Sequence, residues 1–153
     1  MEPPPSADES SSGTYHRRFE PLAAVVGGIA VASGLAWACL RYRPSRVEIE
    51  GGSMMPTLLP GDWVLVVEPR GYRTGDVVVV EHPGRPGYEM VKRITASPGE
   101  VVSERRLGPD EWWVQGDHGS STDSRHFGPV GGDALRAKVT LIYGPKDRRR
   151  RVR

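Results

Sequence analysis

The sequence predicts a mostly β domain that is preceded by one transmembrane helix. The 153 residues include 19 Gly and 14 Pro, a share that favours short strands joined by turns over a helical bundle. After Arg46 the apolar residues fall in short runs bounded by turn residues, which is typical of strands. Before that point, residues 21–40 form one long apolar run without any charged residue.

The N-terminal region divides into two segments of different composition. Residues 1–20 are rich in Pro, Ser and acidic residues, and we predict a disordered tail because little there offsets the entropy of ordering. Residues 21–40 read PLAAVVGGIAVASGLAWACL. Twenty residues at about 1.5 Å each extend about 30 Å as a helix, which matches the hydrocarbon core of a bilayer. Arginines flank the run on both sides, and we therefore predict a transmembrane helix over 21–40.

Other interpretations of this apolar run stay open. Ala36-Trp37-Ala38 has the small-x-small form of a signal-peptide cleavage site, so the run is also compatible with a cleaved segment. A buried helix of a soluble protein is a further alternative. Two arginines precede the run and three follow it closely, which slightly favours a cytoplasmic C-terminal part.

The rest of the chain, up to residue 144, predicts short strands. Val77–Val80 is a continuous apolar run suited to a central strand, whereas Val64 and Val66 show the alternation of a half-buried strand. Turn residues separate the runs. The expected strands are Arg46–Glu50, Asp62–Val67, Asp76–Glu81, Tyr88–Thr95, Glu100–Glu104, Glu111–Gln115 and Val139–Tyr143.

Residues 145–153 form a basic C-terminal tail. It contains one Lys and five Arg, although the net charge of the whole chain is only +2. A solvated chain end and an attraction to anionic lipid head groups are both compatible with this composition. Nucleic acid is not an expected partner, since no aromatic platform accompanies the charge. The single Cys39 excludes an intramolecular disulfide and a multi-thiolate metal site.

Three segments contain residues whose side chains can take part in a chemical reaction. Gly51-Gly52-Ser53 precedes Pro56, and such a turn can expose a hydroxyl beside free backbone N–H groups. Lys92 is in step with Met90 and Ile94, so it lies on an apolar strand face where an ammonium is costly. If Lys92 is buried, its pKa falls and the neutral amine can act as a base. Residues 116–125 form a dense polar loop.

Taken together and in this order, the three segments resemble the type I signal peptidase family, whose members are serine proteases with a Ser/Lys dyad. The resemblance extends from about Ile49 to Tyr143. GGSMMPTL fits the nucleophile motif fully, and KRITASPGEVV fits the lysine segment with Ala96 in place of the usual Gly. In the last segment, GDHGSSTDSRHFGPV, His118 replaces the commoner Asn and the loop is one residue short.

The resemblance implies a role for each matched residue. It implies that Ser53 is the nucleophile and Lys92 its general base. Ser121, counted back from the DSR motif, corresponds to the hydroxyl that orients the lysine amine. Asp123 and Arg125 resemble the structural ion pair of the family. The oxyanion hole uses the backbone N–H of Ser53.

The resemblance also implies a shallow pocket that accepts small residues before the cleaved bond. Ordinary core packing explains the corresponding apolar residues equally well. They are Ile49, Met54, Leu58, Met90 and Val91.

These features predict an antiparallel, signal-peptidase-like catalytic domain over 46–144, with no cofactor and no metal. The expected function is that of a membrane-anchored serine endopeptidase that removes N-terminal signal or leader peptides. Its expected partners are precursor proteins and membrane lipids, and its oligomeric state stays open. The resemblance implies a single-pass anchor in the cell membrane, with the catalytic domain on the extracytoplasmic side. The arginines that flank the apolar run slightly favour the opposite orientation.

Two alternative functions remain open at this point. Small members of the family include mitochondrial inner-membrane peptidases and proteases proposed to mature nickel-type superoxide dismutase, so a dedicated maturation protease is one alternative. A catalytically silent, membrane-bound β domain that binds peptide or lipid is the other.

Overall fold

The computed structural model describes residues 28–29, 31–37 and 44–152, which belong to two units that divide after Trp37. In the first unit, residues 28–29 and 31–37 are helical and exposed. The expected disordered tail and the remainder of the expected transmembrane helix lie outside the described residues. Within the described ranges, no helix combines the length and the apolar character needed to cross a membrane.

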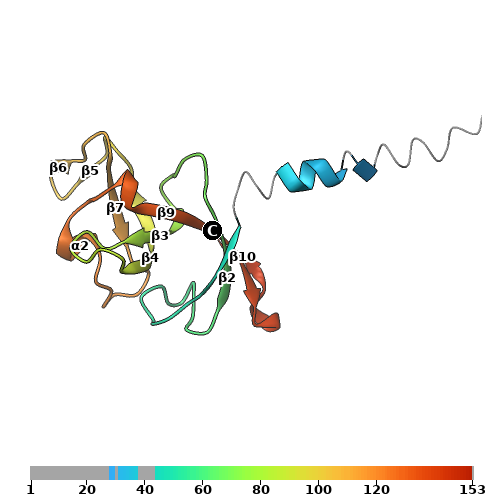
Figure 1. Cartoon of the computed structure of the whole chain (residues 1–153). Coiled ribbons are helices and arrows are strands. Elements are labelled where there is room, and N and C mark those ends of the chain that lie inside the picture. The colour runs from blue at the N-terminus through green and yellow to red at the C-terminus, as the bar shows by residue number, and fades with distance from the viewer. Residues whose placement is uncertain (1–27, 30, 38–43, 153) are drawn as a thin grey trace, which may run out of the picture. The chain divides into compact units, whose positions relative to one another are not determined.

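An antiparallel sheet forms most of the second unit, as predicted (Figure 1). Its strands pair in the order β1-β2-β9-β3-β4-β7-β8, and β10 also pairs with β9. A separate hairpin consists of β5 and β6. The strands of the sheet are β1 (Ser45–Glu48), β2 (Trp63–Val67), β3 (Val77–Glu81), β4 (Glu89–Ala96), β7 (Glu111–Gln115), β8 (Val130–Gly131), β9 (Leu135–Gly144) and β10 (Arg150–Arg151).

Strand β3 occupies the centre of the sheet, between β9 and β4. All four valines of Val77–Val80 are buried, as the continuous apolar run predicts. Val77 and Val79 belong to one apolar cluster, and Val78 and Val80 to another. The strand is therefore covered on both faces, which explains the absence of polar alternation in its sequence.

One expected strand is wrong. The segment Glu100–Glu104 forms only β5 (Val101–Val102) and then reverses at Ser103 and Glu104, whose φ values are 48° and 67°. The chain returns as β6 (Arg105–Arg106). Neither turn residue is Gly or Asn, so the sequence contains no clear signal for this hairpin.

Two loops at the sheet carry the residues that the sequence singles out. The Ser53 loop (residues 49–62) connects β1 to β2, and the Ser121 loop (residues 116–123) connects β7 to the short helix α2 (Ser124–Phe127). Strand β4, which lies between the two loops in the sequence, carries Lys92. Two 3-10 turns flank β9 in the sequence: η1 (Gly132–Ala134) precedes it and η2 (Lys146–Arg148) follows it.

Candidate active site

The Ser53 loop is a hydrogen-bonded turn that leaves Ser53 half-buried. The backbone N–H of Ile49 donates to the carbonyl of Asp62 at 2.8 Å, which closes the two ends of the loop. Within it, the N–H of Leu58 donates to the carbonyl of Met54 at 2.9 Å. Gly51 has a φ of 76°, a conformation that favours glycine. Among the described residues, no group accepts a hydrogen bond from the Ser53 N–H.

Lys92 is buried, with only 3% of its surface exposed. It lies on the same face of β4 as Ile94 and Ala96, which are also buried. Its Nζ donates to the Oγ of Ser121 at 2.8 Å. Burial lowers the pKa of Lys92; the charge of Asp123 acts to raise it, and that of Arg125 to lower it. The environment therefore favours a neutral amine compared with a lysine in water.

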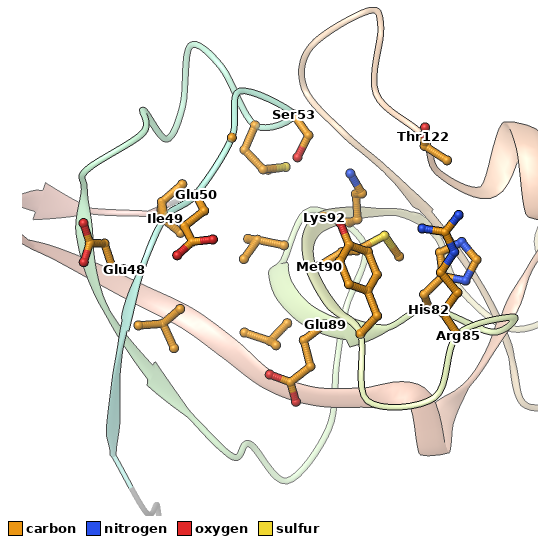
Figure 2. A pocket seen from close by; sticks show the side chains of 16 residues that line it. Glu48, Ile49, Glu50, Ser53, His82, Arg85, Glu89, Met90, Lys92 and Thr122 are labelled. Carbon is orange, nitrogen blue, oxygen red and sulfur yellow. The ribbon is translucent and has the colours of Figure 1, made fainter.

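Ser53 and Lys92 line one cavity of about 470 Å³. Figure 2 shows both side chains at this cavity, with the amine of Lys92 directed to the side on which Ser53 lies. One residue comes from a loop that follows β1 and the other from β4, so the fold brings to one cavity two side chains that are distant in sequence. A serine nucleophile with a lysine base requires a hydroxyl and a desolvated amine in one site.

The Ser121 loop is fixed by a buried carboxylate. Asp123 is fully buried and accepts from the Nε and Nη2 of Arg125 at 2.9 and 2.7 Å. It also accepts from the backbone N–H groups of Gly116 and Arg125, the second of which lies in the first turn of α2. Burial works to raise the pKa of Asp123, but the bonds from Arg125 and from these amides outweigh it and hold the pKa at about 2. Asp123 and Arg125 thus form a structural ion pair beside the 3% exposed Ser121.

Gly116 is a residue whose role the sequence does not reveal beyond its place in the polar loop. A methyl group built on it would overlap the hydroxyl of Ser121 and lie 2.5 Å from the carbonyl oxygen of Ser53. The N–H of His118 donates to that same carbonyl at 3.0 Å. The two loops therefore touch directly, and the contact leaves no room for a side chain at residue 116.

A second link between the loops was not predicted. Arg93, the neighbour of Lys92, donates to both carboxylate oxygens of Asp117, at 2.9 and 2.7 Å. Thr57, from the Ser53 loop, donates to the same carboxylate. Burial acts to raise the pKa of Asp117, but the bonds from Arg93 and Thr57 prevail and lower it. Only the spatial proximity of three segments reveals this network.

The expected substrate residues divide into two groups. Ile49, Met54, Met90 and Val91 line the cavity. Leu58 is fully buried in the apolar cluster with Val64 and does not line it. Two exposed glutamates from the β1 side of the cavity and one from the β4 side were not predicted, nor were a His and an Arg from the loop between β3 and β4. These residues are Glu48, Glu50, Glu89, His82 and Arg85 (Figure 2).

The site offers no evident metal centre: the described part of the chain contains no group of three His, Cys, Asp or Glu side chains placed to hold an ion. Besides the charged side chains named above, the cavity contains the hydroxyl of Ser53 and the amine of Lys92.

The chain is similar in sequence to known proteases of membranes and to a signal peptidase. The mitochondrial inner membrane protease subunit 2 of Mus musculus is 36% identical over 144 residues, which cover 82% of this chain and 81% of that protein. The mitochondrial ATP-independent inner membrane protease subunit 1a of Arabidopsis thaliana is 35% identical over 126 residues, covering 70% and 74%. Signal peptidase I of Buchnera aphidicola is 36% identical over 72 residues, covering 37% and 23%. Residues 22–106 match the family described as signal peptidase, peptidase S26. The chain therefore belongs to the peptidase S26 signal peptidase family, a family of peptidase hydrolases.

Proposed function

We propose that this chain is a membrane-anchored serine endopeptidase that cleaves N-terminal signal or leader peptides from exported precursors with a Ser53/Lys92 dyad. The observation that carries the proposal is the buried Lys92 amine, which donates to Ser121 and lines the same cavity as Ser53. A lysine acts as a base only when it is neutral, and desolvation favours that state.

Catalysis on this proposal proceeds through an acyl-enzyme. Neutral Lys92 takes the proton of the Ser53 hydroxyl while Oγ attacks the scissile carbonyl carbon, and the Ser53 N–H donates to the developing oxyanion. The C–N bond then breaks, and the Lys92 ammonium gives its proton to the leaving amine. A water molecule then transfers a proton to Lys92 while its oxygen attacks the ester carbonyl. The Lys92 ammonium returns this proton to the Ser53 Oγ as the ester C–O bond breaks, which releases the acid and restores the neutral amine.

The neighbouring residues position the Lys92 amine and the loop that contacts it. The Oγ of Ser121 accepts from Lys92 and fixes the direction of the amine. The Asp123–Arg125 pair holds the Ser121 loop through the Gly116 amide and the start of α2. None of these three side chains exchanges a proton with substrate in this scheme.

The substrate binds as an extended strand between the segment that follows β1 and the first residues of β4. Both segments line the cavity. Ile49, Met54, Met90 and Val91 form its apolar part, which suits small side chains before the cleaved bond.

The membrane anchor of the proposal is the apolar run 21–40, which crosses the cell membrane once and leaves the catalytic domain on the extracytoplasmic side. The names of the mouse and Arabidopsis relatives support an association with a membrane, since both are inner membrane proteases. Exported precursors reach a protease on that side only after they have crossed.

The decisive test compares two single variants of the full chain in detergent micelles or liposomes. Ser53→Ala and Lys92→Ala are each expected to lower kcat on a precursor or an Ala-x-Ala peptide by about 10⁴-fold, because either change removes the activated nucleophile. Lys146→Ala, an exposed lysine on η2, is the matched control and should keep wild-type activity. Circular dichroism and the Tm check that each variant folds.

Cleavage at the wild-type rate by Lys92→Ala would overturn the dyad. Rapid cleavage of one precursor together with slow cleavage of generic Ala-x-Ala peptides would instead identify a dedicated maturation protease.

A further inference from the structure

The basic C-terminal segment 145–152 folds back onto the Ser53 loop. Arg148 donates from its Nε and Nη2 to the two carboxylate oxygens of Asp62, at 2.7 and 2.9 Å. Asp62 is the last residue of the Ser53 loop and is only 1% exposed. A paired arginine and carboxylate with two parallel bonds fix both distance and direction.

Asp62 is itself the point at which the Ser53 loop closes. Its carboxylate accepts from the N–H of Leu59 at 2.9 Å. Its backbone carbonyl accepts from the N–H of Ile49, and its own N–H donates to the carbonyl of Leu59. Arg148 therefore holds the residue that ties the two ends of the loop together.

Two further contacts attach the same segment to the loop. The Nη2 of Arg150 donates to the carbonyl of Thr57 at 2.8 Å. Val152 packs against the apolar cluster that contains Met54 and Leu58. Three residues of the segment thus contact the loop or its apolar support.

The contacts of the C-terminal segment are with the Ser53 side of the proposed dyad. Lys92 is held by β4 and by Ser121, and the charges that shift its pKa are those of Asp123 and Arg125. Ser53 lies on a loop that Asp62 closes, and its carbonyl also accepts from the N–H of His118 on the Ser121 loop. Arg148 and Arg150 bond to the Ser53 loop and not to these surroundings of Lys92, so a change at either residue acts first on the position of Ser53.

From these contacts we infer that Arg148, Arg150 and Val152 form a clamp that positions the nucleophile, with Arg148 as its central positioning residue. The inference rests on the proposed function, because it assigns the clamp to the Ser53 of that dyad. A nucleophile displaced by about 1 Å costs on the order of 10²-fold in rate.

Hydrogen–deuterium exchange on full-length Arg148→Ala tests the clamp itself. We expect exchange at the amides of Leu58 and Leu59 to rise at least tenfold, while amides of β3 and β4 keep wild-type exchange. Arg149→Ala is the matched control, since Arg149 donates to the carbonyl of Tyr143 on β9 and not to the loop. Unchanged exchange in the loop of Arg148→Ala would overturn the inference.

Steady-state kinetics on an Ala-x-Ala peptide test the effect on the nucleophile. Arg148→Ala is expected to lower kcat between about tenfold and 10²-fold, with KM within about twofold of wild type. The pH at which activity rises should not move, because Lys92 keeps its surroundings. Arg148→Lys, which loses the paired bonds but keeps the charge, should fall between Arg148→Ala and wild type.

A double variant separates positioning from stability. In Arg148→Ala the buried Asp62 carboxylate loses its partner, which destabilises the fold. Asp62→Asn in the same chain removes that charge and retains an oxygen for the Leu59 N–H, so the Tm should recover while kcat stays low. Recovery of kcat together with the Tm would overturn the clamp. If the wild-type chain cleaves no peptide at all, the proposed function fails, while the exchange measurement still decides whether the clamp exists.

Discussion

The protonation state of Lys92 depends on three influences that act at one side chain. Burial lowers its pKa, the carboxylate of Asp123 opposes this effect, and the guanidinium of Arg125 adds to it. Because Arg125 and Asp123 are paired with each other, the amine experiences a nearly neutral ion pair. The pair thus limits how strongly the buried carboxylate stabilises an ammonium at Lys92.

This balance predicts a shift in the pH profile. A group whose deprotonated form is active gives a rate that rises as the pH increases through its pKa. Arg125→Gln removes a positive charge and leaves Asp123 less compensated, so the pKa of Lys92 should increase. We expect the rise of kcat/KM on a peptide substrate to move to higher pH. Arg105→Gln, which removes an exposed pair with Glu111, is the control and should leave the profile unchanged. A profile that moves to lower pH in Arg125→Gln would contradict this account.

The low pKa of Asp123 also predicts that the folded state loses stability in acid. Its pKa is about 2 in the folded protein and 3.8 as the ordinary value, so its charge stabilises the fold above about pH 4. This contribution, about 2 kcal/mol, is lost as the pH falls from 4 toward 2. Urea unfolding of wild type and Asp123→Asn at pH 7 and pH 3 measures it. The variant should be less stable at pH 7 and should lose less on acidification; an equal loss in both proteins would contradict the prediction.

At the scale of elements, the contact between the Ser53 and Ser121 loops leaves space only for glycine at residue 116. Gly116→Ala is expected to displace either the Ser121 hydroxyl or the Ser53 carbonyl, since the new methyl group overlaps both. We predict a loss of kcat of at least 10²-fold on a peptide substrate. Gly119→Ala in the same loop has open space around its added methyl and serves as the control. Wild-type kcat and KM in Gly116→Ala would contradict this prediction, because they would mean that the two loops can move apart without loss of activity.

The elements that the sequence predicts correctly are those whose burial follows a local pattern. Strand β3 is apolar throughout because both of its faces are covered, and β4 alternates because one face is buried. Lys92 is conspicuous for the same reason, since it interrupts the buried face of β4. The sequence motifs around Ser53 and Asp123 also identify the two loops that carry candidate site residues.

Other elements depend on contacts that no local pattern records. Helix α2 is a single turn that begins with the carboxylate of Asp123, which also binds Arg125 and Gly116. Strand β10 exists because β9 is long enough to pair with it beyond the end of β3. The bond between Arg148 and Asp62 joins residues 86 positions apart, so the basic composition of the C-terminal segment alone does not indicate it.

At the scale of the whole molecule, the proposed membrane anchor predicts how the chain partitions between membrane and solution. The run 21–40 lies largely outside the described residues, and its sequence predicts a single span. We expect the full-length chain to stay with membranes during alkaline carbonate extraction, and a chain without residues 1–40 to be released. Release of the full-length chain would contradict the anchor.

The contact between Arg148 and Asp62 has a consequence for the synthesis of this protein. Arg148 follows Asp62 by 86 residues, so it leaves the ribosome well after the Ser53 loop that it holds. A nascent chain that already includes Ser53 and Lys92 but not yet Arg148 lacks the contact that positions the proposed nucleophile. We therefore expect proteolytic activity to begin only after Arg148 has been translated. Truncated products that contain Ser53 and Lys92 but stop before Arg148 should likewise be inactive.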